Sequence, residues 1–389
     1  MGIFRGALAP GHDNQSDSGG YTMRLKTLFA ALLALAVLAV GAMPAHAAAK
    51  KVRAAFVLLE SINDQGWTTA HHEGIEYMKK QLGDQVEVSY TENVISPADA
   101  ERVIRNYARQ GYDIIFGTTF THMEPMFKVA GEFPKTKFMH CSGFKTRPNM
   151  GTYMVRIEQG EYLAGYLAGL MGYKNVGTVA TQPIPEVVRG INAFTLGLKR
   201  GLDEKGTKYD ADRLNTVVWL KSWRDAVNET TLAEVLAAKK HDLIRQMADT
   251  ADSSRAACAK GVPAVGYGTD AAKYGAACAI TSTTFQWGPV YVDVLKKVMA
   301  GTWKPEEIFT GFEAGGVGLS AFGKAVPKAA ADKVLALKAK MAKGEDMSFA
   351  GPIVDQAGTE RIKKGEKAGD KELLSMRWFV KGVSGKLPD

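Results

Sequence analysis

Seven aromatic or hydrogen-bonding residues lie just after predicted strands, where sheets of α/β proteins bind ligands. Aromatic rings can stack on the flat face of a heterocycle, while amide, hydroxyl and carboxyl groups can hydrogen-bond to its edge. No pair of arginines that could clamp a phosphate or carboxylate accompanies them. These residue types favour a planar, neutral, polar ligand. The candidates for ligand contact are Asn63, Trp67, Thr119, Phe120, Trp223, Gln246 and Asp270.

Each candidate could instead have a purely structural role. Trp67 begins a predicted helix and could belong to the core, but its polar flanks argue against burial and for ligand contact. Phe120 could cover the core of its domain. Asn63 and Asp270 could each cap the helix that follows, a role compatible with ligand contact. Trp223 precedes a predicted helix as Trp67 does, so the two rings could contact a ligand from opposite sides.

An enzyme is the alternative class, and the sequence gives it little support. Ser61, Ser222 and Ser282 lack the GxSxG frame of a hydrolase nucleophile. His122 and Glu124 lie two positions apart at a helix start, so they do not face each other. Dinucleotide and P-loop fingerprints are absent, as are CxxC and HExxH spacings. We therefore expect a binding protein with no catalytic residues, no metal site and no cofactor.

The first residues read as a leader that is removed. Arg24 and Lys26 precede an apolar run over residues 28–43, and the small residues Ala45 and Ala47 fit a signal-peptidase site. No cysteine follows that site, so we expect no lipid anchor. This predicts a leader and signal peptide over residues 1–47 and an exported, soluble protein starting at Ala48.

Charge and cysteine usage set further limits. The net charge of +8 over 389 residues is mild, and the basic residues are scattered. No basic stripe interleaved with aromatics is present, so we expect no nucleic-acid partner. Cys258 and Cys278 lie near each other in the predicted fold and could form a disulfide in an exported protein. Cys141, at the end of an apolar strand, is expected to be a buried small hydrophobe.

Predicted strands and helices alternate in two consecutive series, which predicts an α/β protein with two doubly wound lobes. We expect an N-terminal lobe over residues 48–157, completed by about 285–315, and a C-terminal lobe over 158–284. Residues 316–389 are expected to return through the hinge and end in a helical, Lys/Ala-rich tail. Glycine and alanine over 164–172 predict a helix that approaches its sheet closely. Two such lobes facing each other would close on a ligand by hinge motion.

Several stretches, in this order and spacing, resemble the basic membrane protein family, the purine-nucleoside-type receptors of ABC transporters. They are Asn63-Asp64-Gln65-Gly66-Trp67, Asp113-Ile114-Ile115-Phe116-Gly117, Glu161-Tyr162-Leu163-Ala164-Gly165, Gly266-Tyr267-Gly268-Thr269-Asp270 and Thr281-Ser282. The resemblance implies a type I periplasmic-binding-protein fold with two lobes, three hinge crossings and a ligand cleft between the lobes.

The resemblance also implies roles for four residues. Trp67 stands where the family has a phenylalanine that stacks on the base, and Asn63 matches a polar contact to the base. Trp223 lies in the region that supplies the second stacking ring. Asp270 matches the acid that holds the ribose hydroxyls.

The sequence departs from the nucleoside receptors after Thr281-Ser282. Those receptors often carry a lysine there as a sugar contact, whereas this chain has Thr283-Thr284-Phe285-Gln286. Bulky rings at Trp67 and Phe285 would also reduce the space for a sugar. We therefore expect a free purine base such as adenine, delivered to an ABC permease in the inner membrane by a monomeric receptor. A purine nucleoside receptor, a sugar or amide receptor and a sensor partner are the alternatives.

Overall fold

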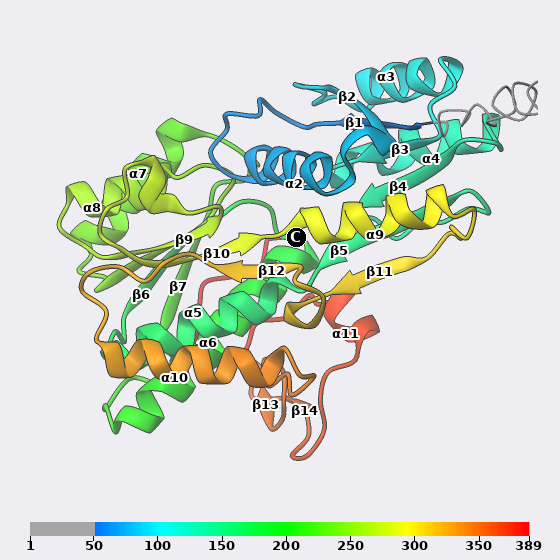
Figure 1. The fold of residues 1–389 in the computed structure, drawn as a ribbon. Helices are drawn as coiled ribbons and strands as arrows, with labels where there is room; N and C mark the ends of the chain where they lie inside the picture. Colours follow the sequence, from blue (N-terminus) through cyan, green and yellow to red (C-terminus); the bar gives the residue numbers. More distant parts are fainter. Residues whose placement is uncertain (1–50, 389) are drawn as a thin grey trace, which may run out of the picture. The chain divides into compact units, whose positions relative to one another are not determined.

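The computed structural model describes residues 51–388, so the predicted leader over 1–47 lies outside the described residues. Two large sheets, each with helices on both faces, organise the described chain (Figure 1). We call the first sheet with its helices the first lobe, and the second sheet with its helices the second lobe. The α/β class and the doubly wound lobes predicted from the sequence are confirmed.

The sheet of the first lobe has six strands in the order β11-β5-β4-β3-β1-β2, all paired in parallel. Alternate residues of its strands face opposite ways, and both sets are buried, which explains the continuous apolar runs in the sequence. Phe56 packs toward α2 and α9, while Val57 packs toward α3 and α4. The elements are β1 (Val52–Val57), α2 (Trp67–Leu82), β2 (Val86–Thr91), α3 (Pro97–Arg109), β3 (Ile114–Gly117), α4 (Met123–Glu132), β4 (Lys137–Cys141), β5 (Met150–Val155), α9 (Trp287–Met299) and β11 (Glu307–Thr310).

The sheet of the second lobe has seven strands in the order β12-β10-β9-β8-β6-β7-β15. Only β12 runs antiparallel to its neighbour. Helices α7 and α8 cover one face, and α5 and α6 cover the other. The elements are α5 (Ile157–Met171), β6 (Val176–Ala180), α6 (Pro185–Lys205), β7 (Asn215–Trp219), α7 (Ala226–Ala238), β8 (Leu243–Met247), α8 (Asp252–Ala259), β9 (Ala264–Gly268), β10 (Ala279–Phe285), β12 (Val317–Leu319) and β15 (Val383–Ser384).

Strand order reverses between β1 and β3 in the first lobe and between β6 and β8 in the second. At such a point the chain leaves neighbouring strands in opposite directions, so a crevice opens beyond their carboxyl ends. The chain passes between the lobes three times, from β5 to α5, from β10 to α9 and from β11 to β12. The three crossings implied by the family resemblance are therefore present.

Glycines bring α5 and α6 together more closely than larger residues would allow. A Cβ atom at Gly165 would lie 2.0 Å from the carbonyl oxygen of Phe194, and one at Gly197 would lie 2.0 Å from that of Tyr162. Backbone therefore packs against backbone. The small residues over 164–172 were expected to bring their helix close to a sheet, but the structure shows that they serve contact with a second helix.

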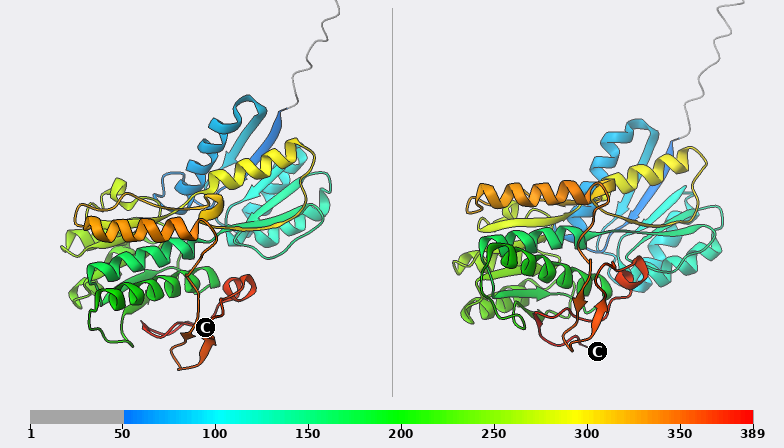
Figure 2. Two further views of the ribbon diagram at one scale, coloured as in Figure 1. Left: turned by 60° about the horizontal axis from the view of Figure 1, so that its bottom comes forward. Right: turned by 90° about the horizontal axis from the view of Figure 1, so that it is seen from below.

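The C-terminal segment is less helical than expected. Its principal helix is α10 (Lys328–Met341), followed by β13 (Ile353–Val354), β14 (Glu360–Ile362) and the short α11 (Asp370–Leu374). The chain then adds β15 to the edge of the second sheet, beside β7. In both views of Figure 2 the C-terminal segment, drawn in orange to red, lies beside the green helices of the second lobe. Asn192 on α6 holds this segment by donating to the carbonyl oxygen of Trp378 at 2.7 Å and accepting from the amide of Val380 at 3.0 Å.

The cysteines divide as the sequence suggested. A disulfide joins Cys258, at the end of α8, to Cys278, just before β10, within the second lobe. Cys141 is a free, buried thiol at the end of β4. Burial raises the pKa of the Cys141 thiol well above its ordinary value, which keeps it protonated and unreactive.

Candidate functional site

An aromatic pocket lies between the lobes, at the carboxyl ends of their strands. Its cavity volume is about 20 Å³, far below the roughly 300–1,000 Å³ of ligand pockets, so side chains nearly fill it in this structure. The first lobe supplies Leu59, Trp67, Thr119, Phe120 and Ser142. The lining from the second lobe is Thr181, Ile184, Glu186, Val187, Trp223, Met247, Asp249 and Tyr267.

Asp64 shapes the loop that carries Trp67 into the pocket. Its carboxylate accepts hydrogen bonds from the amides of Gly66, Thr68 and Thr69, at 2.7 to 2.9 Å. These are amides at the start of α2, which have no partner within the helix. The polar sequence before Trp67 is thus a helix-capping loop.

Trp67 is buried, with 7% of its surface exposed, so the expectation that its polar flanks prevent burial was wrong. Its indole Nε1 donates to the carbonyl oxygen of Thr118 at 2.7 Å. Its ring packs edge-on against Phe285 and Trp287. These contacts fix the ring in one position, and the part that remains accessible lines the pocket.

Trp223 approaches the pocket from the second lobe, in the loop between β7 and α7. Its side chain is only partly buried. Its carbonyl oxygen accepts from the amide of Asp249 at 3.4 Å, which keeps the two loops together. The neighbouring Lys221 has a φ of 58°, a left-handed conformation that is strained for a residue with a side chain.

Four of the seven predicted contacts meet in this pocket: Trp67, Thr119, Phe120 and Trp223. The other three are not among its lining residues, and their ligand contacts stay predictions. Asn63 is exposed. Gln246 is buried and donates to the carbonyl oxygen of Tyr267 at 3.2 Å. Asp270 caps the 3₁₀ turn Ala271–Tyr274 by accepting from the amide of Ala272.

Two acids and a phenol in the pocket were not among the predicted contacts: Glu186, Asp249 and Tyr267. The sequence could have marked Asp249 as a ligand contact, because it follows β8 by two residues just as Thr119 follows β3. Glu186 lies in the first turn of α6, where a carboxylate is favourable at any helix, so its type alone did not mark it.

The pocket is lined by two acids, Glu186 and Asp249, among mostly apolar side chains. Burial raises the pKa of the Glu186 carboxyl, an effect that nearby Arg189 opposes. Burial also raises the pKa of the Asp249 carboxyl well above its ordinary value, and the charges of surrounding acids act in the same direction. No lysine or arginine is among the lining residues that the structure describes. A ligand with N–H groups is therefore favoured over an anion.

Hydrogen bonds connect the lobes around the pocket. Ser142 of the first lobe donates to the carboxylate of Glu186 in the second at 2.9 Å. The backbone oxygen and the side-chain oxygen of Gln65 accept from Thr269 and Arg255, both at 2.5 Å. Gln65 has a φ of 70° and Ser142 one of 60°, so strained backbone accompanies these contacts. The structure thus shows the lobes closed over the pocket.

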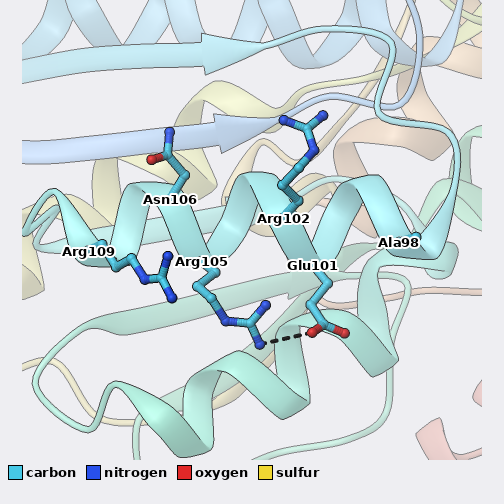
Figure 3. Close-up of a pocket in the computed structure, with 6 residues that line it drawn as sticks. All are labelled: Ala98, Glu101, Arg102, Arg105, Asn106 and Arg109. Carbon is cyan, nitrogen blue, oxygen red and sulfur yellow. Dashed lines mark ion pairs between the residues drawn. The ribbon is translucent and has the colours of Figure 1, made fainter.

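A hollow on the outer surface of the first lobe is larger but has a different character (Figure 3). Its lining residues all belong to α3. Arg105, the central cation, pairs with Glu101 at 2.9 Å and with Glu132 at 2.7 Å. Unlike the aromatic pocket, this hollow is not lined by residues from both lobes.

Comparison with known proteins places the chain among transport receptors. The pattern of the family described as PnrA-like ABC transporter substrate-binding proteins matches residues 51–345. A purine-binding protein of Brucella abortus is 37% identical over 345 residues, which cover 88% of this chain and 96% of that protein. A candidate ABC transporter glucose-binding protein of Haloferax volcanii is 34% identical over 338 residues, covering 87% and 81% of the two chains.

Solved structures agree on the fold. An ABC transporter solute-binding protein from Conexibacter woesei superimposes with a TM-score of 0.61 at 27% identity, covering 76% of this chain and 97% of that one. One from Aeropyrum pernix gives 0.63 at 19% identity, covering 76% and 92%. Among the residues that the structure describes, no helix is both long and apolar enough to cross a membrane.

Proposed function

Because this chain belongs to the PnrA-like family of ABC transporter substrate-binding proteins, we propose that it is a periplasmic receptor that binds a free purine base, of the adenine type, for uptake. The observation that carries the proposal is the closed pocket in which Trp67 and Trp223 face one small space from opposite lobes. The purine-binding relative in Brucella abortus supports the same ligand class.

The pocket chemistry fits a base. Stacking of a base on an aromatic side chain contributes about 1–3 kcal/mol. Two such contacts with a few hydrogen bonds are consistent with a dissociation constant in the micromolar range or below, or roughly −8 kcal/mol. Thr119, Ser142 and Thr181 add hydroxyl groups to the lining, each able to donate or accept a hydrogen bond. Transport, rather than catalysis, is the role that this arrangement serves.

Aromatic packing beside the pocket supports a base over a nucleoside. Phe285 and Trp287 pack edge-on against Trp67, so bulky rings occupy that side of the site. Gln286, in the segment where nucleoside receptors often have lysine, is turned toward Thr284, to which it donates at 2.9 Å. A signal peptide, periplasmic location, an inner-membrane permease partner and a monomeric state are parts of this proposal.

The test is a ligand screen on the mature protein, residues 48–389, by thermal shift followed by calorimetry. A ligand that binds only the folded protein raises its melting temperature. We expect adenine to raise it and adenosine, glucose and amino acids not to. A larger shift with adenosine would indicate that the ligand is the nucleoside rather than the free base. A response to glucose alone would favour the sugar alternative, which the Haloferax volcanii relative represents.

A further inference from the structure

The carboxyl group of Asp249 lies in the pocket and has no hydrogen-bond partner among the residues that the structure describes. The residue is 6% exposed and lies among the pocket-lining aromatics. Its backbone is fixed, because its amide donates to Trp223 and its carbonyl oxygen lies against Gly66 of the first lobe. Within residues 51–388, no group donates a hydrogen bond to its carboxyl oxygens. Buried polar groups are rarely left in this state, so the ligand is the expected partner.

The charges around Asp249 disfavour its ionised form. Asp64 and Glu60 after β1 and Glu186 on α6 act on it through their charges, and Glu229 on α7 adds to this effect where it is ionised. The cations nearby are engaged elsewhere. Arg189 pairs with Glu158 at 3.0 Å, Arg224 lies 3.9 Å from Glu60, and Arg255 pairs with Asp252. Burial in such surroundings favours the protonated form of an acid.

A neutral carboxylic acid presents one O–H donor beside one acceptor oxygen, the same pattern as an asparagine amide. Asparagine pairs with adenine through the amino group N6 and the ring nitrogen N7, one hydrogen bond in each direction. Adenine presents an N–H group beside a ring nitrogen acceptor on each of its edges. Guanine has an edge with two adjacent N–H donors, which an ionised carboxylate would match instead.

We propose that Asp249 binds the base as a neutral carboxylic acid, donating its proton to a ring nitrogen and accepting from the neighbouring N–H group. The inference rests on the proposed function and adds the residue that selects an adenine-type edge. Glu186 is unsuited to this role because its carboxylate already accepts from Ser142.

The test compares Asp249→Asn with Asp249→Ala by calorimetry with adenine and guanine. Asparagine keeps the donor and acceptor of the neutral acid, so Asp249→Asn should bind adenine within about threefold of the wild type. Asp249→Ala should lose about tenfold to a hundredfold, since a good bidentate pair contributes about 1–3 kcal/mol. The matched control is Asp84→Asn, the same change at a fully exposed side chain outside the pocket.

A pH series separates the two protonation states. If the neutral acid is the binding form, wild-type affinity should fall as rising pH removes the proton, whereas Asp249→Asn should keep its affinity. Equal losses in Asp249→Asn and Asp249→Ala, or guanine bound more tightly than adenine, would overturn the inference while leaving a purine receptor in place. A wild-type protein that binds no purine base would sink both the inference and the proposed function.

Discussion

At the scale of single residues, Trp67 and Trp223 share one pocket but differ in what else holds them. Trp67 is buried, hydrogen-bonded to the backbone and packed on three aromatic side chains. Trp223 is partly exposed and lies in a loop. Loss of the first ring therefore changes core packing as well as the pocket, whereas loss of the second changes mainly the pocket.

We predict that Trp223→Ala lowers affinity for the base at least about tenfold with little change in melting temperature, because a stacking surface is lost without a core cavity. Trp223→Phe should restore most of the affinity. Trp67→Ala should in addition lower the free energy of unfolding by about 3–5 kcal/mol. Calorimetry and urea denaturation measure the two effects, and an unchanged affinity in Trp223→Ala would remove this ring from the site.

Glu229 gives a prediction for stability against pH. Burial raises its pKa from an ordinary 4.5 to about 8, although Thr250 donates to its carboxylate at 2.9 Å. The folded protein then retains a proton that the unfolded chain loses, so stability falls as pH rises from about 4.5 to about 8. Glu229→Gln has no proton to lose. Relative to this variant, the wild type should lose on the order of 4 kcal/mol across that range.

Urea denaturation of the unliganded proteins at about pH 5 and pH 8.5 would measure this difference. Stabilities of the wild type and Glu229→Gln that move in parallel between the two pH values would show that Glu229 ionises normally.

At this scale the sequence predicted aromatic contacts better than acidic ones. Trp67 and Trp223 both come after strands, at the edge of the sheet where ligands bind, so their residue type and their position pointed to the same role. Asp249 differs from an ordinary surface aspartate only by its burial and by the acids from other elements around it. Those are tertiary properties, which a local pattern does not contain.

At the scale of secondary structure elements, closure brings the loop before α2 against the loop after β8. A Cβ atom added at Gly66 would lie 2.0 Å from the carbonyl oxygen of Asp249, far inside contact distance. The lack of a side chain at Gly66 therefore permits the close approach of the two lobes.

We predict that Gly66→Ala prevents the lobes from reaching this closed form and weakens ligand binding at least tenfold, without lowering the melting temperature of the unliganded protein by more than about 2 °C. Small-angle scattering with and without ligand would show the missing compaction. Gly369→Ala is the control, since a Cβ atom there would meet nothing within 4 Å and its φ is −82°. Compaction of Gly66→Ala equal to that of the wild type would contradict this assignment.

The strands and helices themselves were largely predictable. Buried parallel strands form short apolar runs, and both faces of these sheets are covered, so the runs were distinct. What the pattern did not reveal was the partner of each element. Gly165 and Gly197 indicate a close approach, but only the structure shows that each lies against the backbone of the other helix.

At the scale of the whole described chain, the C-terminal segment is attached to both the second lobe and the hinge region. Arg156, in the first crossing between the lobes, pairs with Asp370 at 2.6 Å. Arg189 donates to the carbonyl oxygen of Leu373 at 3.3 Å. Leu374 and Arg377 line a groove that shares Phe120 and three other residues with the ligand pocket. This segment therefore borders the approach to the ligand.

We predict that Asn192→Ala frees the segment after residue 375. Asn192 is fully buried, and its loss leaves the carbonyl of Trp378 and the amide of Val380 without their partner. Each unsatisfied buried group costs about 1–3 kcal/mol. Limited proteolysis should cut the variant in this segment much faster than the wild type. Asn228→Ala on the exposed start of α7 is the control, and equal cleavage rates would refute the attachment.

The final strand of each sheet comes late in the chain. The edge strand β11 of the first sheet ends at Thr310, and β15 closes the second sheet at Val383–Ser384. A chain that emerges from the N-terminus first therefore has both sheets incomplete, with exposed strand edges, for most of its synthesis. Such high contact order slows folding. A chain whose sheets close late stays unfolded for longer, and its open strand edges can pair with other chains during that interval.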